Sequence, residues 1–362
     1  MKVYIATFTR YENYGSRLQN FALCYAIKKL GAEPITLIVN SKKDILIKNV
    51  KKILSYFPII TKKQSVWISE IKKSRKNLDF TKKLNFFAIN YDDLNNINFK
   101  NSIAIVGSDQ VWSPVHLKKR PDDIELFFLR FVPQNKRFAY APSFGVKEIP
   151  YDLVKMYKTY ISDFNKVSVR ENTGKNIIEE MVGINVPVLP DPTFLLNKNE
   201  WEKIAKKKLN IASKYILVYF LSEQPSAVMQ KIKQYAKANK LEIIYIIGNI
   251  YHKNDFVPTP EEFIKLINSA EVVFTDSFHG CVFSIIMQTS FIVFERNDVE
   301  QFSRIDTLLK RYDLEKNIVK TNELWKIDFK NKITKEKFQL IAKLMEKEQQ
   351  KGIDYLRNIL NN

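Results

Sequence analysis

The chain has 362 residues but little cysteine and little histidine. Its two cysteines, Cys24 and Cys281, are too few for a disulfide framework or a four-ligand zinc site. Both lie in apolar, helix-like stretches, where thiols usually serve as small core residues. This usage favours a reducing, cytoplasmic compartment. No His/Cys/Asp spacing matches a known metal site, so we expect neither a metal ion nor a resident cofactor.

Long hydrophobic runs are also missing from the sequence. The first residues, MKVYIATFTRYEN, lack the apolar core and cleavage site of a secretory signal. No apolar run approaches the roughly 20 residues that span a bilayer. We therefore expect a soluble protein without a leader or an anchor.

What is present is enough apolar material, 45% of residues, to fill two domains. Short apolar runs alternate with helical patterns, which is typical of α/β proteins. Asn13 and Gly15 predict a tight turn before the first helix, and a proline-rich stretch around Pro190 predicts a domain boundary. The expected domains are residues 1–197 with an insertion over 41–90, residues 198–330, and a helical tail over 331–362.

The net charge of +19 is concentrated in one segment. Residues 41–83 hold thirteen Lys/Arg and three Asp/Glu, giving +10. A solvated surface insertion is one interpretation. Another is a helix over residues 45–57 that rests on anionic lipid head groups. Nucleic-acid binding is a weaker alternative because the chain has no DNA- or RNA-binding motif.

Polar clusters follow the predicted strands at the points where those strands end. They read ENYGS (12–16), GSDQVW (107–112), PSFG (142–145), SVREN (168–172), PDPTF (190–194) and TDSFHG (275–280). In parallel α/β sheets, ligands bind at these carboxyl ends. These five clusters, with SVREN and PDPTF counted together, therefore mark the strand ends where we expect the site.

His279 falls in the first turn of a helix that Ser277 or a neighbouring residue caps. Unpaired N–H groups at Ser277 and Gly280, with the helix dipole, would make an anion site there. The imidazole would contact a phosphate or donate a proton. The alternative is a histidine that merely hydrogen-bonds near the cap.

Arg170 stands at the end of another predicted strand. Its planar fork suits a carboxylate or a phosphate, although a salt bridge is the simpler role. The candidate carboxylates, each of which could instead cap a helix or fix a turn, are Asp109, Glu171, Asp191 and Asp276.

In their order, the motifs NYGSRLQNFAL, VGSDQVW, APSFG, SVRENTG, LPDPTFLL and TDSFHGCVFSI resemble the polysaccharide pyruvyl transferases over about residues 3–295. The resemblance implies two Rossmann-like domains facing across a cleft, as in GT-B glycosyltransferases. It also implies transfer of the enolpyruvyl-derived group of phosphoenolpyruvate to two sugar hydroxyls, forming a pyruvate ketal. Arg170 and His279 match the donor-site residues of the family.

One departure from the family pattern stands at Ser277, where better-studied branches carry an arginine. The contact that this arginine makes with the donor is therefore either missing or supplied by another residue, such as Arg17, Arg137 or Arg296. Ser16 also stands where many relatives have aspartate.

The resulting assignment has three parts. Donor binding falls to Arg170, Ser277, His279, Gly280 and Asp191, and catalysis to His279 as acid with Asp109 or Glu171 as base. The sugar acceptor, which would be lipid-linked if the basic segment binds a membrane, would contact Asn13, Tyr14, Gln110 and Trp112. Trp112 could instead be a core residue. The alternatives are a GT-B glycosyltransferase with a nucleotide-sugar donor, and a basic nucleic-acid- or membrane-binding protein with an inactive cleft.

Overall fold

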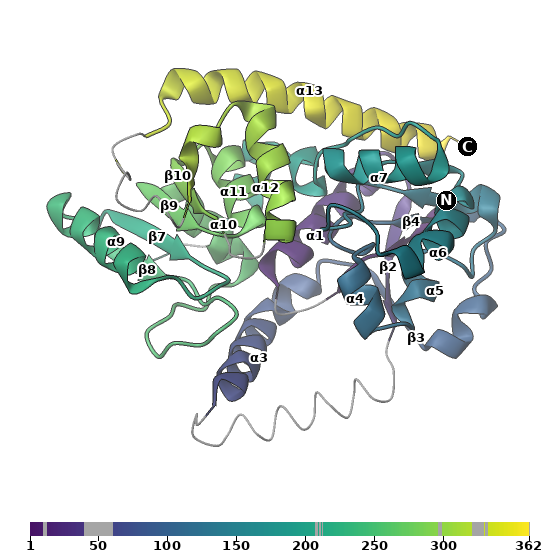
Figure 1. Ribbon diagram of the computed structural model, residues 1–362, viewed down its shortest axis with the longest axis horizontal. Helices are drawn as coiled ribbons and strands as arrows, with labels where there is room; N and C mark the ends of the chain where they lie inside the picture. Colours follow the sequence, from purple (N-terminus) through teal and green to yellow (C-terminus); the bar gives the residue numbers. More distant parts are fainter. Residues whose placement is uncertain are drawn as a thin grey trace.

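A computed structural model describes residues 1–9, 13–39, 61–206, 209, 211, 213–295, 299–320, 329 and 332–361. These residues form two parallel β-sheets surrounded by helices (Figure 1). The fold is α/β with two Rossmann-like domains, as the sequence predicts.

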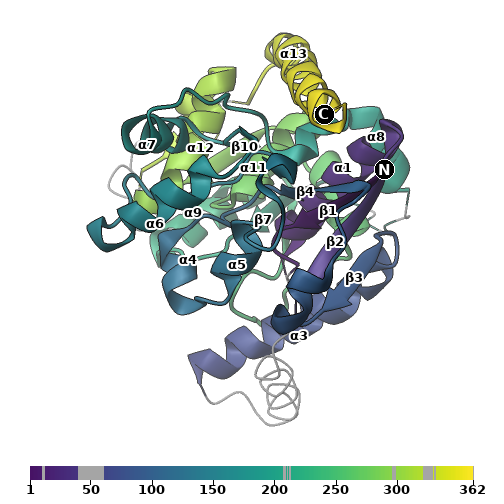
Figure 2. The ribbon, with the colours of Figure 1, turned by 90° about the vertical axis from the view of Figure 1, so that its right-hand side faces the viewer.

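The first sheet has the strand order β3-β2-β1-β4-β5-β6, with all strands parallel. Its strands are β1 (Lys2–Ala6), β2 (Glu33–Val39), β3 (Phe86–Ile89), β4 (Ser102–Val106), β5 (Arg137–Ala139) and β6 (Lys166–Val167). In the register of the sheet centre, Tyr4 pairs with Ile35 on one side and Ala104 on the other. Strands β2, β1 and β4 lie side by side in Figure 2. The strand order reverses between β1 and β4, which is where such sheets bind ligands.

The second sheet has the order β11-β10-β9-β7-β8, again parallel throughout. Its strands are β7 (Tyr215–Tyr219), β8 (Glu242–Tyr245), β9 (Val272–Thr275), β10 (Phe291–Phe294) and β11 (Ile318–Val319). Strands β7, β9 and β10 are fully buried, as expected for parallel strands covered on both faces. Here the order reverses between β7 and β9.

Helices connect the strands and cover the sheets. They are α1 (Tyr14–Lys29), α3 (Lys62–Thr81), α4 (Pro114–Lys119), α5 (Asp123–Phe127), α6 (Tyr151–Ser162), α7 (Asn172–Val182), α8 (Lys198–Ile204), α9 (Ser226–Ala238), α10 (Pro260–Ser269), α11 (Phe278–Met287), α12 (Val299–Tyr312) and α13 (Lys335–Leu360). Short 3-10 turns are η1 (Tyr91–Asn96), η2 (Gln134–Lys136), η3 (Pro192–Leu195) and η4 (Glu315–Asn317).

The turn predicted at Asn13 and Gly15 is wrong. Helix α1 already begins at Tyr14, because the Asn13 side chain accepts a hydrogen bond from the N–H of Ser16 and caps it. Strands β3 and β11 were not predicted from the sequence. The boundary predicted at residue 197 lies between β6 and β7 and stays a prediction.

The two domains share apolar packing beside the strand ends. The Tyr14 ring of α1 stacks on Phe263 of α10, with centroids 5.0 Å apart. Trp201 of α8 contacts Phe21 of α1 and Phe283 of α11. One hydrophobic cluster therefore continues from the first domain into the second and fixes α1 against α10 and α11.

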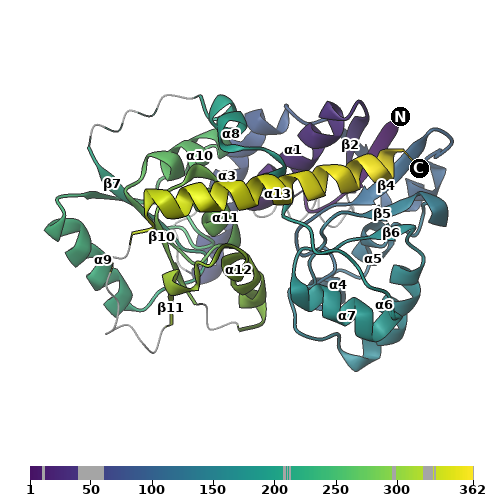
Figure 3. The same cartoon turned by 90° about the horizontal axis from the view of Figure 1, so that it is seen from above.

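Helix α13, the predicted tail, returns to the first domain. Figure 3 shows it running across both domains. Gln349 donates to the carbonyl of Leu195, and the Tyr355 hydroxyl donates to that of Ala139 at 3.0 Å. The helix is a brace between the two halves.

Helix α3, part of the basic segment, packs on the second domain. The Ser69 hydroxyl and the Lys73 ammonium both donate to the carbonyl of Gly248, at 2.7 and 2.8 Å. Lys62 pairs with Glu223. Part of the positive charge thus holds the domains together, whereas the helix predicted over residues 45–57 lies outside the described residues.

Candidate active site

Arg170 and Asp191 form the centre of the site. The Arg170 side chain follows β6 and is 4% exposed. Its Nη1 donates to Asp191 Oδ2 at 2.7 Å and lies 3.4 Å from the Ser108 hydroxyl. Its Nε and Nη2 are buried without a hydrogen-bond partner among the described residues. Two donors of the guanidinium fork are therefore left for a ligand.

Phe278 completes the surroundings of the guanidinium. Arg170 Cζ lies 4.5 Å from the centroid of the Phe278 ring. This cation–π contact joins a first-domain side chain to the first residue of α11 in the second domain. It keeps the plane of the guanidinium beside the helix start.

His279 is the next residue of α11, in the first turn, as predicted. Its Nε2 lies 3.6 Å from Asp191 Oδ2 and has no hydrogen-bond partner in the described part of the chain. Arg170 and His279 therefore meet at one carboxylate oxygen. A cationic guanidinium and an imidazole are brought together from different domains.

Asp191 is the counter-ion of this pair and not a ligand of an anionic donor, which corrects the predicted role. Its other oxygen accepts hydrogen bonds from the N–H and the hydroxyl of Thr193. Burial would raise the pKa of this carboxyl, but His279, Arg170 and the Thr193 N–H hold the pKa well below its usual value. Asp191 is therefore ionised, and it holds the Arg170 guanidinium and the His279 imidazole close together.

Asp109 follows β4 and has a left-handed backbone, with φ 79°. Its Oδ2 accepts from the Ser16 hydroxyl at 2.5 Å, and its Oδ1 lies 4.0 Å from Arg170 Nη2. Burial would raise its pKa, but the charges of Arg170 and His279, with the Ser16 bond, lower it. Asp109 is thus an ionised carboxylate beside the free side of Arg170.

Glu171, the other predicted base, holds the loop at Ser143 and Phe144 in place through hydrogen bonds. Its Oε1 accepts from the Ser143 hydroxyl at 2.8 Å and from the Phe144 N–H at 3.0 Å. Its Oε2 lies 3.9 Å from Arg170 Nε. Since the side chain is 1% exposed, Glu171 is less accessible than Asp109.

The backbone amides predicted to bind the donor at Ser277 and Gly280 are engaged within the protein. The Ser277 N–H donates to Thr275 Oγ1 at 3.0 Å, and the Gly280 N–H donates to Ser277 Oγ at 3.3 Å. The helix cap takes both amides, so this part of the prediction is corrected.

Asp276, another candidate carboxylate, organises the loop after β7. Its oxygens accept from the N–H groups of Leu221 at 2.6 Å and Ser222 at 2.9 Å. These bonds tie the end of β7 to the end of β9. Asp276 is therefore a positioning residue in the second sheet.

Two of the four predicted acceptor residues, Tyr14 and Trp112, are buried. Trp112 is fully buried, because its ring stacks on Phe128 and its Nε1 donates to the carbonyl of Phe127. Tyr14 is 1% exposed in the domain interface. Asn13 is exposed but caps α1, and Gln110 is partly buried against Gly145.

Two of the three arginines predicted to compensate for Ser277, Arg17 and Arg137, lie in the described part of the chain. Arg137 bonds the carbonyls of Val132 and Arg130 and pairs with Asp163, so it is structural. Arg17 donates to the carbonyl of Thr9, and Arg296 lies outside the described residues.

Arg304 of α12 is a site residue that the sequence did not reveal. It is 9% exposed, and its Cζ lies 5.6 Å from the Phe278 ring, which Arg170 also contacts. It also lowers the pKa of Asp109. Because α12 carries no motif-like pattern at this position, only the packing of the helices could identify it.

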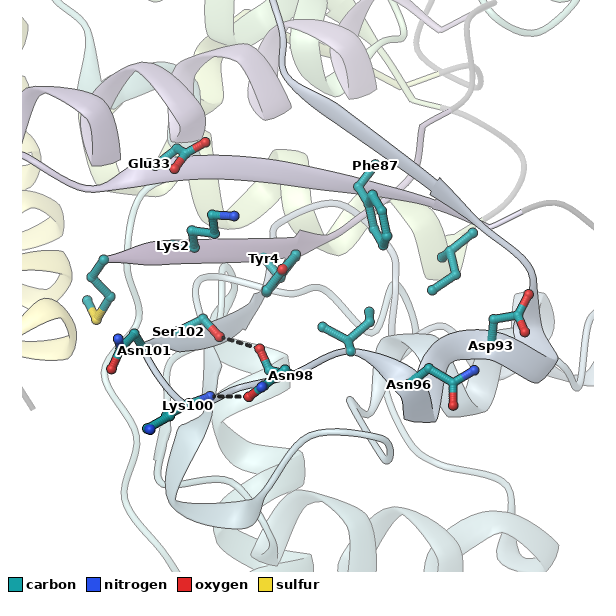
Figure 4. A pocket seen from close by; sticks show the side chains of 13 residues that line it. Lys2, Tyr4, Glu33, Phe87, Asp93, Asn96, Asn98, Lys100, Asn101 and Ser102 are labelled. Atoms are coloured by element: carbon teal, nitrogen blue, oxygen red, sulfur yellow. Dashed lines mark hydrogen bonds between the residues drawn. The ribbon is translucent and has the colours of Figure 1, made fainter.

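A cavity of about 930 Å³ lies in the first domain beside the amino ends of several strands, whereas Arg170 and Asp109 follow carboxyl ends. Figure 4 shows Lys2, Glu33 and Ser102 around it, at the amino ends of β1, β2 and β4. None of the predicted site residues lines this cavity. Its position separates it from the Arg170–His279 site.

Two negative findings apply to the described residues. They contain no group of three or more His, Cys, Asp or Glu side chains arranged to hold a metal ion. No helix in this part of the chain is both long and apolar enough to cross a bilayer.

The family model described as polysaccharide pyruvyl transferase matches residues 13–298. The chain belongs to this family, which places it among transferases that act on polysaccharides. The match contains Arg170, Asp191 and His279. No curated protein matches the chain.

Solved structures with a similar fold have low sequence identity. The UDP-GlcNAc 2-epimerase of Neisseria meningitidis, bound to UDP-GlcNAc, is 11% identical with a TM-score of 0.44, covering 100% of this chain and 94% of that one. A Streptomyces glycosyltransferase complexed with thymidine diphosphate is 8% identical with a TM-score of 0.45, covering 100% of both. At these identities and TM-scores the likenesses assign no activity to this chain.

Proposed function

We propose that the protein transfers the enolpyruvyl-derived group of phosphoenolpyruvate to two hydroxyls of a sugar, forming a pyruvate ketal and releasing phosphate. One observation carries the proposal. Arg170 and His279 meet at Asp191 with Arg170 Nε, Arg170 Nη2 and His279 Nε2 all lacking hydrogen-bond partners among the described residues. A small metabolite with a carboxylate and a phosphate matches these donors.

The chemistry follows from the placement of these groups. His279 donates a proton to the methylene carbon of the donor, while a sugar hydroxyl adds to C2 and gives its proton to Asp109. A second hydroxyl then displaces the phosphate, which leaves with that hydroxyl's proton. Arg170 stabilises the anionic donor and the departing phosphate throughout.

The test is an assay of the purified protein with phosphoenolpyruvate and candidate oligosaccharides. The expected result is one phosphate released for each acceptor that gains a pyruvate ketal, measured by phosphate detection and mass spectrometry. His279→Ala should abolish both signals while leaving the circular dichroism spectrum unchanged. Nucleotide release from a nucleotide sugar, with no phosphate from phosphoenolpyruvate, would instead favour a glycosyltransferase.

A lipid-linked acceptor forms the second part of the proposal, and the +10 charge of residues 41–83 supports it. Lys62, Lys72, Lys73 and Lys83 already contact the second domain. The other basic residues of the segment would contact anionic lipid. Co-sedimentation with vesicles should rise with their anionic lipid content. Vesicle binding that does not change with the anionic lipid content would refute a membrane role.

A further inference from the structure

A second cavity, of about 460 Å³, lies at the carboxyl ends of β7 and β8. One wall is the loop after β7, and another is the segment that follows β8. Gly248 fixes this geometry, since a Cβ there would lie 2.0 Å from the carbonyl oxygen of Phe220. Helix α3 holds the same glycine from outside through Ser69 and Lys73.

The lining combines aromatic rings with neutral, acidic and basic hydrogen-bonding groups, the basic ones being Lys233 and His252. Phe220 and Tyr245 supply rings, Gln224 and Asn254 supply amides, and Asp255 supplies a carboxylate. Rings pack against the C–H faces of a sugar, while amides and carboxylates bond its hydroxyls. The volume falls within the roughly 300–1,000 Å³ of small-molecule sites.

Asp255 is suited to bind hydroxyl groups. Burial raises its pKa despite the backbone N–H of His252, which donates to Oδ2 at 3.1 Å. The carboxyl is therefore partly withdrawn from water within the lining of the cavity. A sugar hydroxyl could donate a further hydrogen bond to this carboxylate.

Hydrogen bonds link the wall of the cavity to the loop that precedes His279. Leu221, Ser222 and Gln224 line it, and all three donate hydrogen bonds to Asp276. Asp276 stands three residues before His279 in the loop between β9 and α11. A ligand in the cavity therefore lies at the same edge of the second sheet as the catalytic histidine.

We infer that this cavity is a sugar subsite for the acceptor, formed by Tyr245, Gln224, Asn254 and Asp255 in the second domain; the inference rests on the proposed function. It replaces the acceptor site predicted in the first domain, where Tyr14 and Trp112 are buried. One sugar unit of the acceptor occupies the cavity while the hydroxyls of a neighbouring unit reach His279.

The experiment measures sugar binding without phosphoenolpyruvate, by saturation-transfer NMR with free hexoses and N-acetylhexosamines, and with uridine monophosphate as a separate ligand. The full-length protein should show transfer from at least one sugar. Asp255→Asn, which keeps the shape, and Tyr245→Ala should each weaken that sugar's binding about tenfold. Tyr151→Ala, which removes a tyrosine that is 96% exposed on α6, is the matched control and should change nothing.

Three outcomes of the binding experiment would overturn the subsite. They are no transfer from any sugar at millimolar concentration, equal transfer in the wild type and both cavity variants, or displacement of the sugar by uridine monophosphate. The failure of the proposed reaction is separate, because it would appear as intact sugar binding with no phosphate released. An unchanged KM for the acceptor in Asp255→Asn, with active transfer, would also overturn the subsite.

Discussion

Gly15 packs directly on the imidazole of His279. A Cβ at position 15 would lie 2.0 Å from Nδ1 and 2.3 Å from Cγ of that ring. Gly15 is the second residue of α1 in the first domain, and His279 is the second residue of α11 in the second. The absence of a side chain at position 15 allows the two helix starts to meet.

Gly15→Ala should therefore displace the imidazole and lower kcat about a hundredfold. The extra methyl group also costs roughly 1–3 kcal/mol of stability by overpacking. Steady-state kinetics and urea unfolding measure the two effects separately.

The control for this prediction is Gly31→Ala. Gly31 has φ +85°, and no neighbouring atom lies within 4 Å of the position that a Cβ would take, so alanine there strains the backbone without touching the site. It should lose stability by about 1 kcal/mol and keep its kcat. Equal kinetic losses in both variants would mean that instability, and not the position of His279, lowers turnover.

Arg170→Lys should keep the charge but lose the planar fork. We expect kcat/KM for phosphoenolpyruvate to fall about 10- to 100-fold, or roughly 1.4–2.7 kcal/mol of transition-state stabilisation. Arg137→Lys is the matched control, because Arg137 is equally buried but bonds Val132 and Asp163 outside the site. Arg137→Lys should lower the free energy of unfolding and leave kcat/KM unchanged. If kcat/KM instead falls in Arg137→Lys and not in Arg170→Lys, Arg170 does not bind the donor.

The sequence could predict the parallel α/β architecture because each strand is a short apolar run between helical patterns. It could also predict that Arg170 and His279 lie near each other, since both stand at strand ends where such sheets bind ligands. It left open whether Trp112 is a core residue or contacts the acceptor, and it gave no sign that Arg304 reaches the site. Those facts depend on how distant helices pack, and neither residue belongs to a local pattern that distinguishes a buried position from a binding position.

The free energy of unfolding should fall at acid pH because of Asp191 and Asp109. Their pKa values are lowered in the folded protein, so the unfolded chain binds more protons at acid pH. Their stabilisation is present above about pH 4, the ordinary aspartate pKa, and is lost as the pH falls further. Urea unfolding at a series of pH values measures this loss.

Asp191→Asn should remove part of that pH dependence and destabilise the protein by about 3–5 kcal/mol, because the buried guanidinium of Arg170 would lose its nearest carboxylate. A variant with the full acid dependence of the wild type would show that Asp191 does not carry it.

Both thiols should resist modification in the folded protein. Cys24 and Cys281 are buried, and burial raises the pKa of Cys24 to about 12 and raises that of Cys281 as well. A chromogenic disulfide reagent at pH 8 should react with neither thiol until denaturant is added, and then with two per chain. Rapid reaction in the native state, with loss of activity, would point to a cysteine in the mechanism.

The most direct test is a crystal structure of the protein with phosphoenolpyruvate bound. The account predicts that the oxygens of the donor lie about 3 Å from Arg170 Nε or Nη2 and from His279 Nε2, with Asp191 still between the two side chains. A donor bound elsewhere, with neither side chain in contact with it, would contradict the account.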